Sequence, residues 1–401
     1  MDSVTAGHQR SAIALVALAH LLSDLQQGVL PVLLLYQRQA LGMSLGQVGL
    51  AAGLNSLALS LSQPLFGHLV DRWGERRIAL AAAAWVAVFA GALGLARSVG
   101  AVVLLASLSA LGPAAFHPAG AAAVGRMNLA RRGLATSVFF VGGTAGLALG
   151  PIIGGAMFGT IGLRGTVWIA LGTLVLAAGV LSVAPLSRQA GPRSVPLRPE
   201  ARPGRVLQLR HFLWGGIGAV LLLTGLRTAF QLSLATYVPQ HLVELGFGQG
   251  QASGGLSLMQ AAVAGGVLLG GVLADRVGPR SLGLAAMLGL APVLVLFAQG
   301  SGAAANLVLV AAGLLIGLPL SMTLVTGQAL LGEARGLASG LVFAASSAAG
   351  AGGVAFTGLL ADHWGLTTAL TALAGLSALA ALVSLALPEK KGALSSAQGH
   401  A

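Results

Sequence analysis

Long apolar stretches, each about the length of one membrane crossing, recur along the whole chain and are separated by short polar turns. A hydrocarbon core about 30 Å thick requires roughly 20 apolar residues per helix. The pattern predicts twelve transmembrane helices, at residues 12–36, 46–69, 78–97, 101–124, 134–158, 166–186, 212–238, 252–274, 281–299, 304–328, 337–360 and 366–387. We therefore expect an all-α membrane protein.

Composition supports this class and excludes others. Hydrophobic residues make up 56% of the chain and charged residues only 8%, against about 25% charged in an ordinary soluble domain. The chain has no cysteine, so disulfide and thiolate chemistry are excluded. The net charge of +12 would favour nucleic-acid binding in a soluble protein, but the basic residues lie between the spans, so we expect a lipid bilayer and no nucleic acid as partner.

The basic residues also predict the orientation. Of the 22 Lys and Arg residues, all but four fall in turns on the side of the amino terminus; Arg38, Arg97 and Arg164 fall on the other side, and Arg227 lies within a span. The positive-inside rule then places both termini in the cytoplasm. We expect a multi-pass monomer in a bacterial cell inner membrane.

The chain divides at its midpoint, where a stretch rich in proline and arginine separates six spans from six. The predicted organisation is an N-terminal six-helix half at 1–186, a cytoplasmic linker at 187–211, a C-terminal six-helix half at 212–388 and a cytoplasmic tail at 389–401. In membrane proteins such repeats usually place the substrate site at their interface.

Two cytoplasmic turns carry the same spaced motif, beginning at positions 67 and 271, which is an offset of 204. Its residues are Gly67, Asp71, Arg72, Gly74 and Arg76 in the first turn and Gly271, Asp275, Arg276, Gly278 and Arg280 in the second. A small residue permits close helix approach, and the aspartate can meet a helix terminus or an arginine. The motif predicts gating loops; the alternative is an ordinary charged turn.

The fifth span contains closely spaced small residues and a proline: Gly146, Gly150, Pro151, Gly154 and Gly155. Glycines lower the steric cost of a helix crossing, and proline removes a backbone hydrogen bond and bends the helix. We expect a tightly packed, bent helix, and packing alone is a sufficient alternative explanation.

The paired loop motifs resemble the signature of the major facilitator superfamily, and the glycine–proline run resembles that of its drug and proton antiporters. The resemblance implies the major facilitator fold, in which twelve transmembrane helices form two pseudo-symmetric six-helix halves. It also implies a secondary active transporter that works by alternating access, and it favours export over uptake.

Ionisable residues inside the membrane are costly and usually functional. Asp24 is the single acidic residue within a predicted span, about 12 residues or roughly 18 Å into the first helix. His20 lies one helical turn before it, and His117 lies between Pro113 and Pro118 in the fourth span. Because imidazole exchanges protons near neutral pH, Asp24, His117 and His20 are the predicted proton-coupling residues. The alternative for both histidines is a role in helix packing.

Arg227 is the one basic residue well inside a span, and an offset of 203 carries Asp24 onto it. The two halves thus present opposite charges at equivalent depth, which predicts a pair that is either functional or purely structural. Arg227 and His117 are the predicted anion-binding residues. The further substrate contacts we expect are hydrogen bonds from Gln27, Gln231 and Tyr237 and apolar walls from Phe116 and Phe230.

Two short segments resemble the fosmidomycin-resistance branch of the superfamily: Phe116-His117-Pro118-Ala-Gly120, and Asp24-x-x-Gln27-Gly28. This resemblance implies drug efflux, antibiotic resistance and proton-coupled export of a small anionic drug such as fosmidomycin. One departure is that many drug and proton antiporters carry an arginine in the fourth span, and this chain has none between Arg97 and Arg126. Coupling must then depend on Asp24, His117 and Arg227.

The alternative function is an uptake or exchange carrier for a small anionic metabolite without proton coupling. An enzyme is not expected, because the sequence has no phosphate-cradling Gly-rich loop with a lysine and no intramembrane group of histidine and acidic residues with metal-ligand spacing. The sequence therefore predicts no catalytic residues, no cofactor and no metal.

Overall fold

A computed structural model describes residues 2–126, 132–184, 186, 216–300, 302–331 and 335–389, and every regular element among them is a helix. The chain forms two compact units: Met1–Leu197 with Gly246–Ser257, and Arg198–Leu245 with Leu258–Ala401. The predicted linker at 187–211 lies outside the described residues, as does the predicted tail apart from Glu389.

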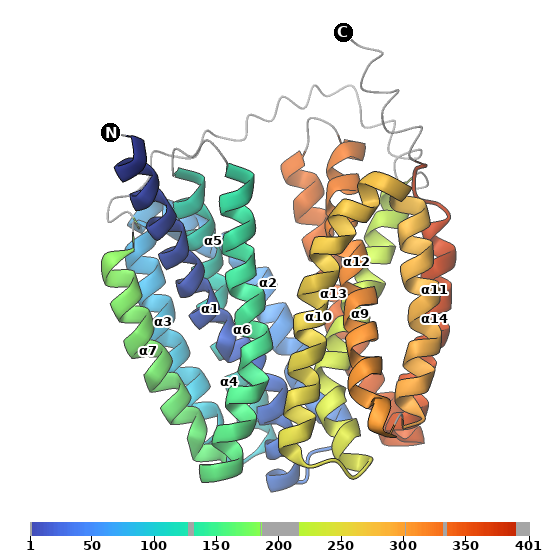
Figure 1. The fold of residues 1–401 in the computed structure, drawn as a ribbon. Helices are drawn as coiled ribbons and strands as arrows, with labels where there is room; N and C mark the ends of the chain where they lie inside the picture. The colour runs from blue at the N-terminus through green and yellow to red at the C-terminus, as the bar shows by residue number, and fades with distance from the viewer. Residues whose placement is uncertain are drawn as a thin grey trace. The chain divides into compact units, whose positions relative to one another are not determined.

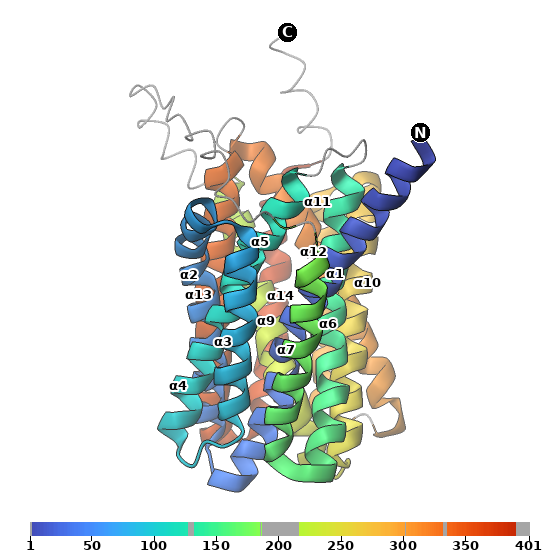
Figure 2. The ribbon, with the colours of Figure 1, turned by 90° about the vertical axis from the view of Figure 1, so that its left-hand side faces the viewer.

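The described helices before the linker are α1 (Asp2–Leu41), α2 (Leu45–Trp73), α3 (Glu75–Leu93), α4 (Val99–Ser109), α5 (Leu111–Arg126), α6 (Arg132–Ile161) and α7 (Gly165–Val183), with the short 3-10 helix η1 (Gly162–Arg164) between the last two. The predicted fourth span is thus interrupted at Ala110, and α4 leads into α5 (Figure 2). Pro113 explains the interruption, because it has no N–H to donate to the carbonyl of Ser109.

The helices after the linker are α9 (Ile217–Glu244), α10 (Gln249–Val277), α11 (Pro279–Ala298), α12 (Ala305–Leu331), α13 (Arg335–Trp364) and α14 (Leu366–Ser384), with η3 (Gly302–Ala304) before α12. Equivalent helices of the two halves pack in the same pairs. The first packs on the fifth, as α1 on α6 and α9 on α13; the third packs on the sixth, as α3 on α7 and α11 on α14 (Figure 1). The packing therefore repeats as the sequence motifs do.

Ten stretches of the described residues are long and apolar enough to cross a membrane. One of them, Ala135–Val183, is 49 residues long and contains most of α6 and all of α7. Counted separately, these two helices, together with the 30-residue α13, bring the described total to the predicted twelve. The fold is an all-α membrane fold with six crossings in each half.

The glycines of α6 explain how closely it packs on α1. A methyl group on Gly146 would lie 2.4 Å from the carbonyl oxygen of Leu21, and one on Gly150 would lie 2.5 Å from that of Leu25. A methyl group on Gly28 of α1 would in turn lie 2.7 Å from the carbonyl oxygen of Leu147. Only residues without a side chain fit at this crossing, so the two backbones are in direct contact.

The other members of the predicted packing motif lie on the same helix. Gly154 faces Val29 of α1, Gly155 is buried, and Pro151 lies inside the helix. Pro151 cannot donate to the carbonyl of Leu147, four residues earlier, which is the carbonyl that Gly28 approaches. Gly146, Gly150 and Gly154 thus lie where α6 meets α1, whereas a methyl group on Gly155 would meet Ser253 of α10.

Candidate functional site

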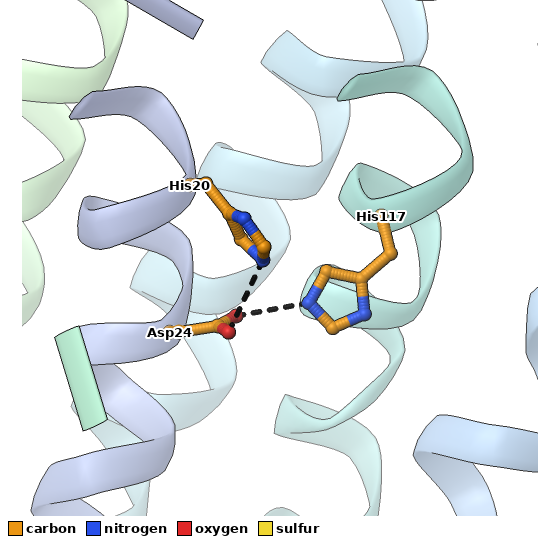
Figure 3. Close-up of side chains that lie close together, drawn as sticks. All are labelled: His20, Asp24 and His117. Carbon is orange, nitrogen blue, oxygen red and sulfur yellow. Dashed lines mark hydrogen bonds and ion pairs between the residues drawn. The ribbon is translucent and has the colours of Figure 1, made fainter. Parts of the chain in front are cut away.

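Three of the predicted residues meet in the N-terminal half. His20 and Asp24 lie one turn apart on α1, and His117 reaches them from α5 (Figure 3). His20 Nε2 lies 3.2 Å from Asp24 Oδ2, and His117 Nε2 lies 3.0 Å from Asp24 Oδ1. Each carboxylate oxygen therefore faces one imidazole. We call these three side chains the His–Asp–His cluster.

The orientation of His20 is held by a backbone and a ring contact from α6 and a ring contact from α5. Its Nδ1 lies 2.8 Å from the carbonyl oxygen of Phe139, and its ring stacks on the Phe139 ring at a centroid distance of 4.1 Å. Phe116 packs at 5.9 Å from the same imidazole. His20 is 4% exposed, so its ring has no freedom to turn away from Asp24.

These contacts constrain where hydrogens lie. A carbonyl oxygen only accepts hydrogen bonds, so the contact with Phe139 requires a hydrogen on His20 Nδ1. The contact between His20 Nε2 and Asp24 Oδ2 needs a second hydrogen, carried by either atom, because two lone pairs at 3.2 Å repel. In this arrangement the three side chains together carry one more proton than they would as two neutral imidazoles and one carboxylate.

His117 is the most accessible member of the cluster. Its side chain is 25% exposed, against 5% for His20 and 11% for Asp24. Its Nδ1 lies 3.4 Å from Nε2 of Gln63 on α2. Pro118 directly follows it and frees the carbonyl of Ala114 from the helical hydrogen-bond pattern.

Gly143 of α6 makes the space in which the cluster forms. A methyl group there would lie 2.6 Å from His20 Nε2 and 2.7 Å from Asp24 Oδ2. The sequence prediction missed Gly143 although the pair Gly142-Gly143 continues the small-residue spacing of the fifth span. It also missed Phe139, whose contribution is a backbone carbonyl, and Gln63.

The expectation of no intramembrane histidine and acidic group with metal-ligand spacing is wrong. Ligand atoms of His20, Asp24 and His117 all lie within 4.8 Å of one another. The spacing along one segment could not reveal this, because His117 is 93 residues from Asp24 in sequence.

Arg227 lies inside the C-terminal half and is 5% exposed. One Nη donates to Gln231 Oε1 at 2.6 Å and the other to Thr228 Oγ1 at 2.9 Å, whereas its Nε has no hydrogen-bond partner. Among the described residues of its own half, no carboxylate pairs with this charge. The predicted pair of Arg227 with Asp24 joins two halves and stays a prediction.

The remaining predicted substrate contacts are dispersed. Gln27 lines a cavity of about 10 Å³ in the N-terminal half, beside Gln26 and Asn55. Phe230 and Tyr237 are fully buried, and the Tyr237 hydroxyl donates to the carbonyl of Val354 on α13 at 2.9 Å. Their contacts hold α9 against its neighbours, and their role toward a substrate stays a prediction.

The two turns that carry the predicted gating motif share one backbone conformation. Gly74 has φ 84° and ψ 152°, and Gly278 has φ 84° and ψ 160°, a region that favours glycine. Each glycine N–H bonds the carbonyl four residues earlier, at 2.8 Å and 2.9 Å respectively. The last glycine of the motif is therefore required by the turn itself.

The arginines of these turns reach neighbouring helix ends. Arg76 donates to the carbonyl of Ser182, near the end of α7, and Arg280 pairs with Glu389. A cation near the carboxyl end of a helix is favourable. Gly67 faces Pro118, whereas nothing lies within 4 Å of a methyl group at Gly271. Asp71 and Arg72 are exposed in the last turn of α2, and Asp275 and Arg276 are exposed in the last turn of α10.

The repeated six-helix packing and the ionisable side chains buried in the first helix of each half define a multi-pass membrane transporter. The family model of the Major Facilitator Superfamily matches residues 16–334, and the chain belongs to this superfamily.

The proteins that are similar to this chain include several named transporters. The fosmidomycin resistance protein of Escherichia coli (strain K12) is 27% identical over 358 residues, covering 87% of this chain and 86% of the relative. The multidrug efflux pump Tap of Mycobacterium tuberculosis (strain ATCC 25618 / H37Rv) is 30% identical over 382 residues, 86% of each protein. A crystal structure of a bacterial homolog of the human lysosomal transporter Spinster matches with a TM-score of 0.79 at 16% identity, over 94% of this chain and 96% of that one.

Proposed function

We propose that this chain is a proton-coupled exporter of small anionic molecules, of which fosmidomycin is an example, and that the His–Asp–His cluster carries the coupling proton. The observation that carries the proposal is that both ring nitrogens of His20 make polar contacts. Its Nδ1 faces the carbonyl oxygen of Phe139, and its Nε2 faces Asp24. That geometry accommodates a proton shared between His20 and Asp24. Release of the proton leaves two lone pairs facing each other in a buried site.

The mechanism is alternating access. The loaded cluster has no net charge, because the shared proton balances the carboxylate of Asp24. Loss of that proton leaves a buried negative charge, which is costly away from water. The two protonation states therefore favour different arrangements of the helices. A coupling ion can drive transport only if its binding favours one arrangement over the other. Proton entry from the outer side drives release of the solute.

Arg227 is the proposed anion-binding residue. Its guanidinium is buried without a carboxylate partner among the described residues of its half, and its neighbours Gln231 and Thr228 contribute oxygens but no charge. A buried cation of this kind is stabilised when an anion binds. The relatives named for fosmidomycin resistance and multidrug efflux support export of a drug.

The test is growth of a drug-sensitive bacterial host that produces the protein, across fosmidomycin and unrelated cationic drugs. The variants Asp24→Asn and Arg227→Ala are compared at matched membrane levels. We expect protection against fosmidomycin in the wild type and none in either variant. Protection that persists in Asp24→Asn contradicts the coupling site. Protection against no drug favours the uptake or exchange carrier, which accumulation of anionic metabolites in proteoliposomes then tests.

A further inference from the structure

The His–Asp–His cluster presents three good metal ligands at one point. Two imidazole nitrogens and a carboxylate oxygen are donors that Zn²⁺ and similar ions accept. A tetrahedral ion with bonds of about 2.1 Å separates its ligand atoms by roughly 3.4 Å. The nitrogens lie 3.0 and 3.2 Å from the carboxylate oxygens, and all the ligand atoms lie within 4.8 Å of one another.

The surroundings of the cluster also suit a metal ion. Histidine ligands commonly donate their second ring N–H to a carbonyl, which fixes the tautomer and points the other nitrogen at the metal. His20 is held in this way by the carbonyl of Phe139 at 2.8 Å. His117 faces the side-chain amide of Gln63 at 3.4 Å. When that amide is turned by about 180°, its oxygen accepts a hydrogen bond from Nδ1 of His117. Nε2 of His117 is then free to bind the metal ion.

We propose that His20, Asp24 and His117 bind one divalent transition-metal ion of the Zn²⁺ type in the place of the shared proton. The displaced proton leaves to solvent, and the single ring hydrogen of His117 moves from Nε2 to Nδ1. Three protein ligands leave one position of a tetrahedral ion for water. The quarter-exposed side chain of His117 provides the open side of the site.

The consequence for transport rests on the proposed function. An ion that occupies the cluster prevents protonation of Asp24 and holds the transporter in one state, so Zn²⁺ is an inhibitor of coupled transport. Binding of the ion rests on the geometry alone and is measured without any transport assay.

The experiment uses the full chain, purified in detergent without a polyhistidine tag. Co²⁺ is the spectroscopic probe, since its visible absorption is much stronger in four-coordinate than in six-coordinate sites, and Zn²⁺ is then added to displace it. We expect one ion per chain with a four-coordinate spectrum. His117→Gln should weaken binding at least about tenfold, and Gln63→Leu should weaken it by about tenfold, as second-shell changes do.

The control is His363→Gln, because His363 is an exposed histidine at the end of α13 and should not affect the spectrum. Absence of a saturable Co²⁺ spectrum in the wild type overturns the proposal. An unchanged affinity in both His117→Gln and Gln63→Leu, or an equal loss in His363→Gln, also overturns it. Elution as a single peak confirms that each variant is folded, and Gln63→Leu leaves all three ligands in place.

The outcomes separate this inference from the proposed function. Metal binding by a chain whose export does not depend on Asp24 refutes the coupling role alone. Loss of coupled export in Asp24→Asn, with no metal binding by the wild type, refutes the metal site alone.

Discussion

A single methyl group at Gly143 should slow coupled transport at least about fivefold. Its carbon would lie 2.6 Å from Cε1 and Nε2 of His20 and 2.7 Å from Oδ2 of Asp24. Non-bonded heavy atoms are most favourable at about 3.5 to 4.0 Å, so these side chains must move apart by roughly 1 Å. His20 cannot retreat without losing its contacts with Phe139.

The magnitude follows from the contacts that this movement breaks. A buried polar group left without its hydrogen bond costs about 1 to 3 kcal/mol. Gly143→Ala also gains up to about 1 kcal/mol in helix propensity, so the fold loses little stability. Proton coupling feels the whole of this energy. A change of about 1 to 3 kcal/mol in the free-energy difference between transport states changes their ratio by roughly 5- to 150-fold.

The assay is efflux of labelled fosmidomycin from proteoliposomes with an imposed pH gradient. The matched controls are Gly172→Ala and Gly179→Ala in α7, where a methyl group meets nothing within 4 Å. We expect the controls to transport at the wild-type rate and Gly143→Ala to lose at least about fivefold. A wild-type rate in Gly143→Ala would refute the reasoning, since it would mean that the observed arrangement of His20 and Asp24 is not needed.

Three further predictions concern other parts of the chain. Arg227→Ala should raise the KM of an anionic substrate at least about tenfold and Arg227→Lys by less, because lysine keeps the charge but loses the planar fork; equal KM values would contradict an anion site. Gly74→Ala and Gly278→Ala should each cost about 1 to 2 kcal/mol from their positive φ, seen as a lower unfolding temperature; Gly100→Ala, which has open space, is the control. Gly150→Ala should cost about 1 to 3 kcal/mol through its clash with α1, and an unchanged unfolding temperature would argue against the close crossing.

The helices were predictable because hydropathy reports burial in a bilayer directly. The first predicted span, 12–36, lies within α1, and the last, 366–387, begins with α14. Pro113 and Pro118 predict a break in the backbone hydrogen bonds around His117, but not its position at Ala110, because composition does not change there and only the missing N–H of Pro113 ends the helix. Span ends are also imprecise where helices continue beyond the apolar core, as α1 does to Leu41.

The site was predictable only where it lies within one helix. The spacing of four between His20 and Asp24 places them on one face, and the scarcity of membrane acids singles out Asp24. The meeting of His117 with Asp24 depends on how α5 packs, which no local pattern records. The roles of Gly143 and the Phe139 carbonyl likewise come from the α1–α6 crossing, since a backbone acceptor leaves no mark on the sequence.

The most direct test of the central claim measures proton movement together with substrate movement in proteoliposomes that contain a pH-sensitive dye. Wild type, Asp24→Asn and the control His363→Gln are compared after addition of fosmidomycin. The account predicts substrate-driven proton flux in the wild type and the control. It predicts none in Asp24→Asn, which should still exchange labelled for unlabelled substrate. Proton flux at the wild-type rate in Asp24→Asn would contradict the assignment of the coupling proton to the His–Asp–His cluster.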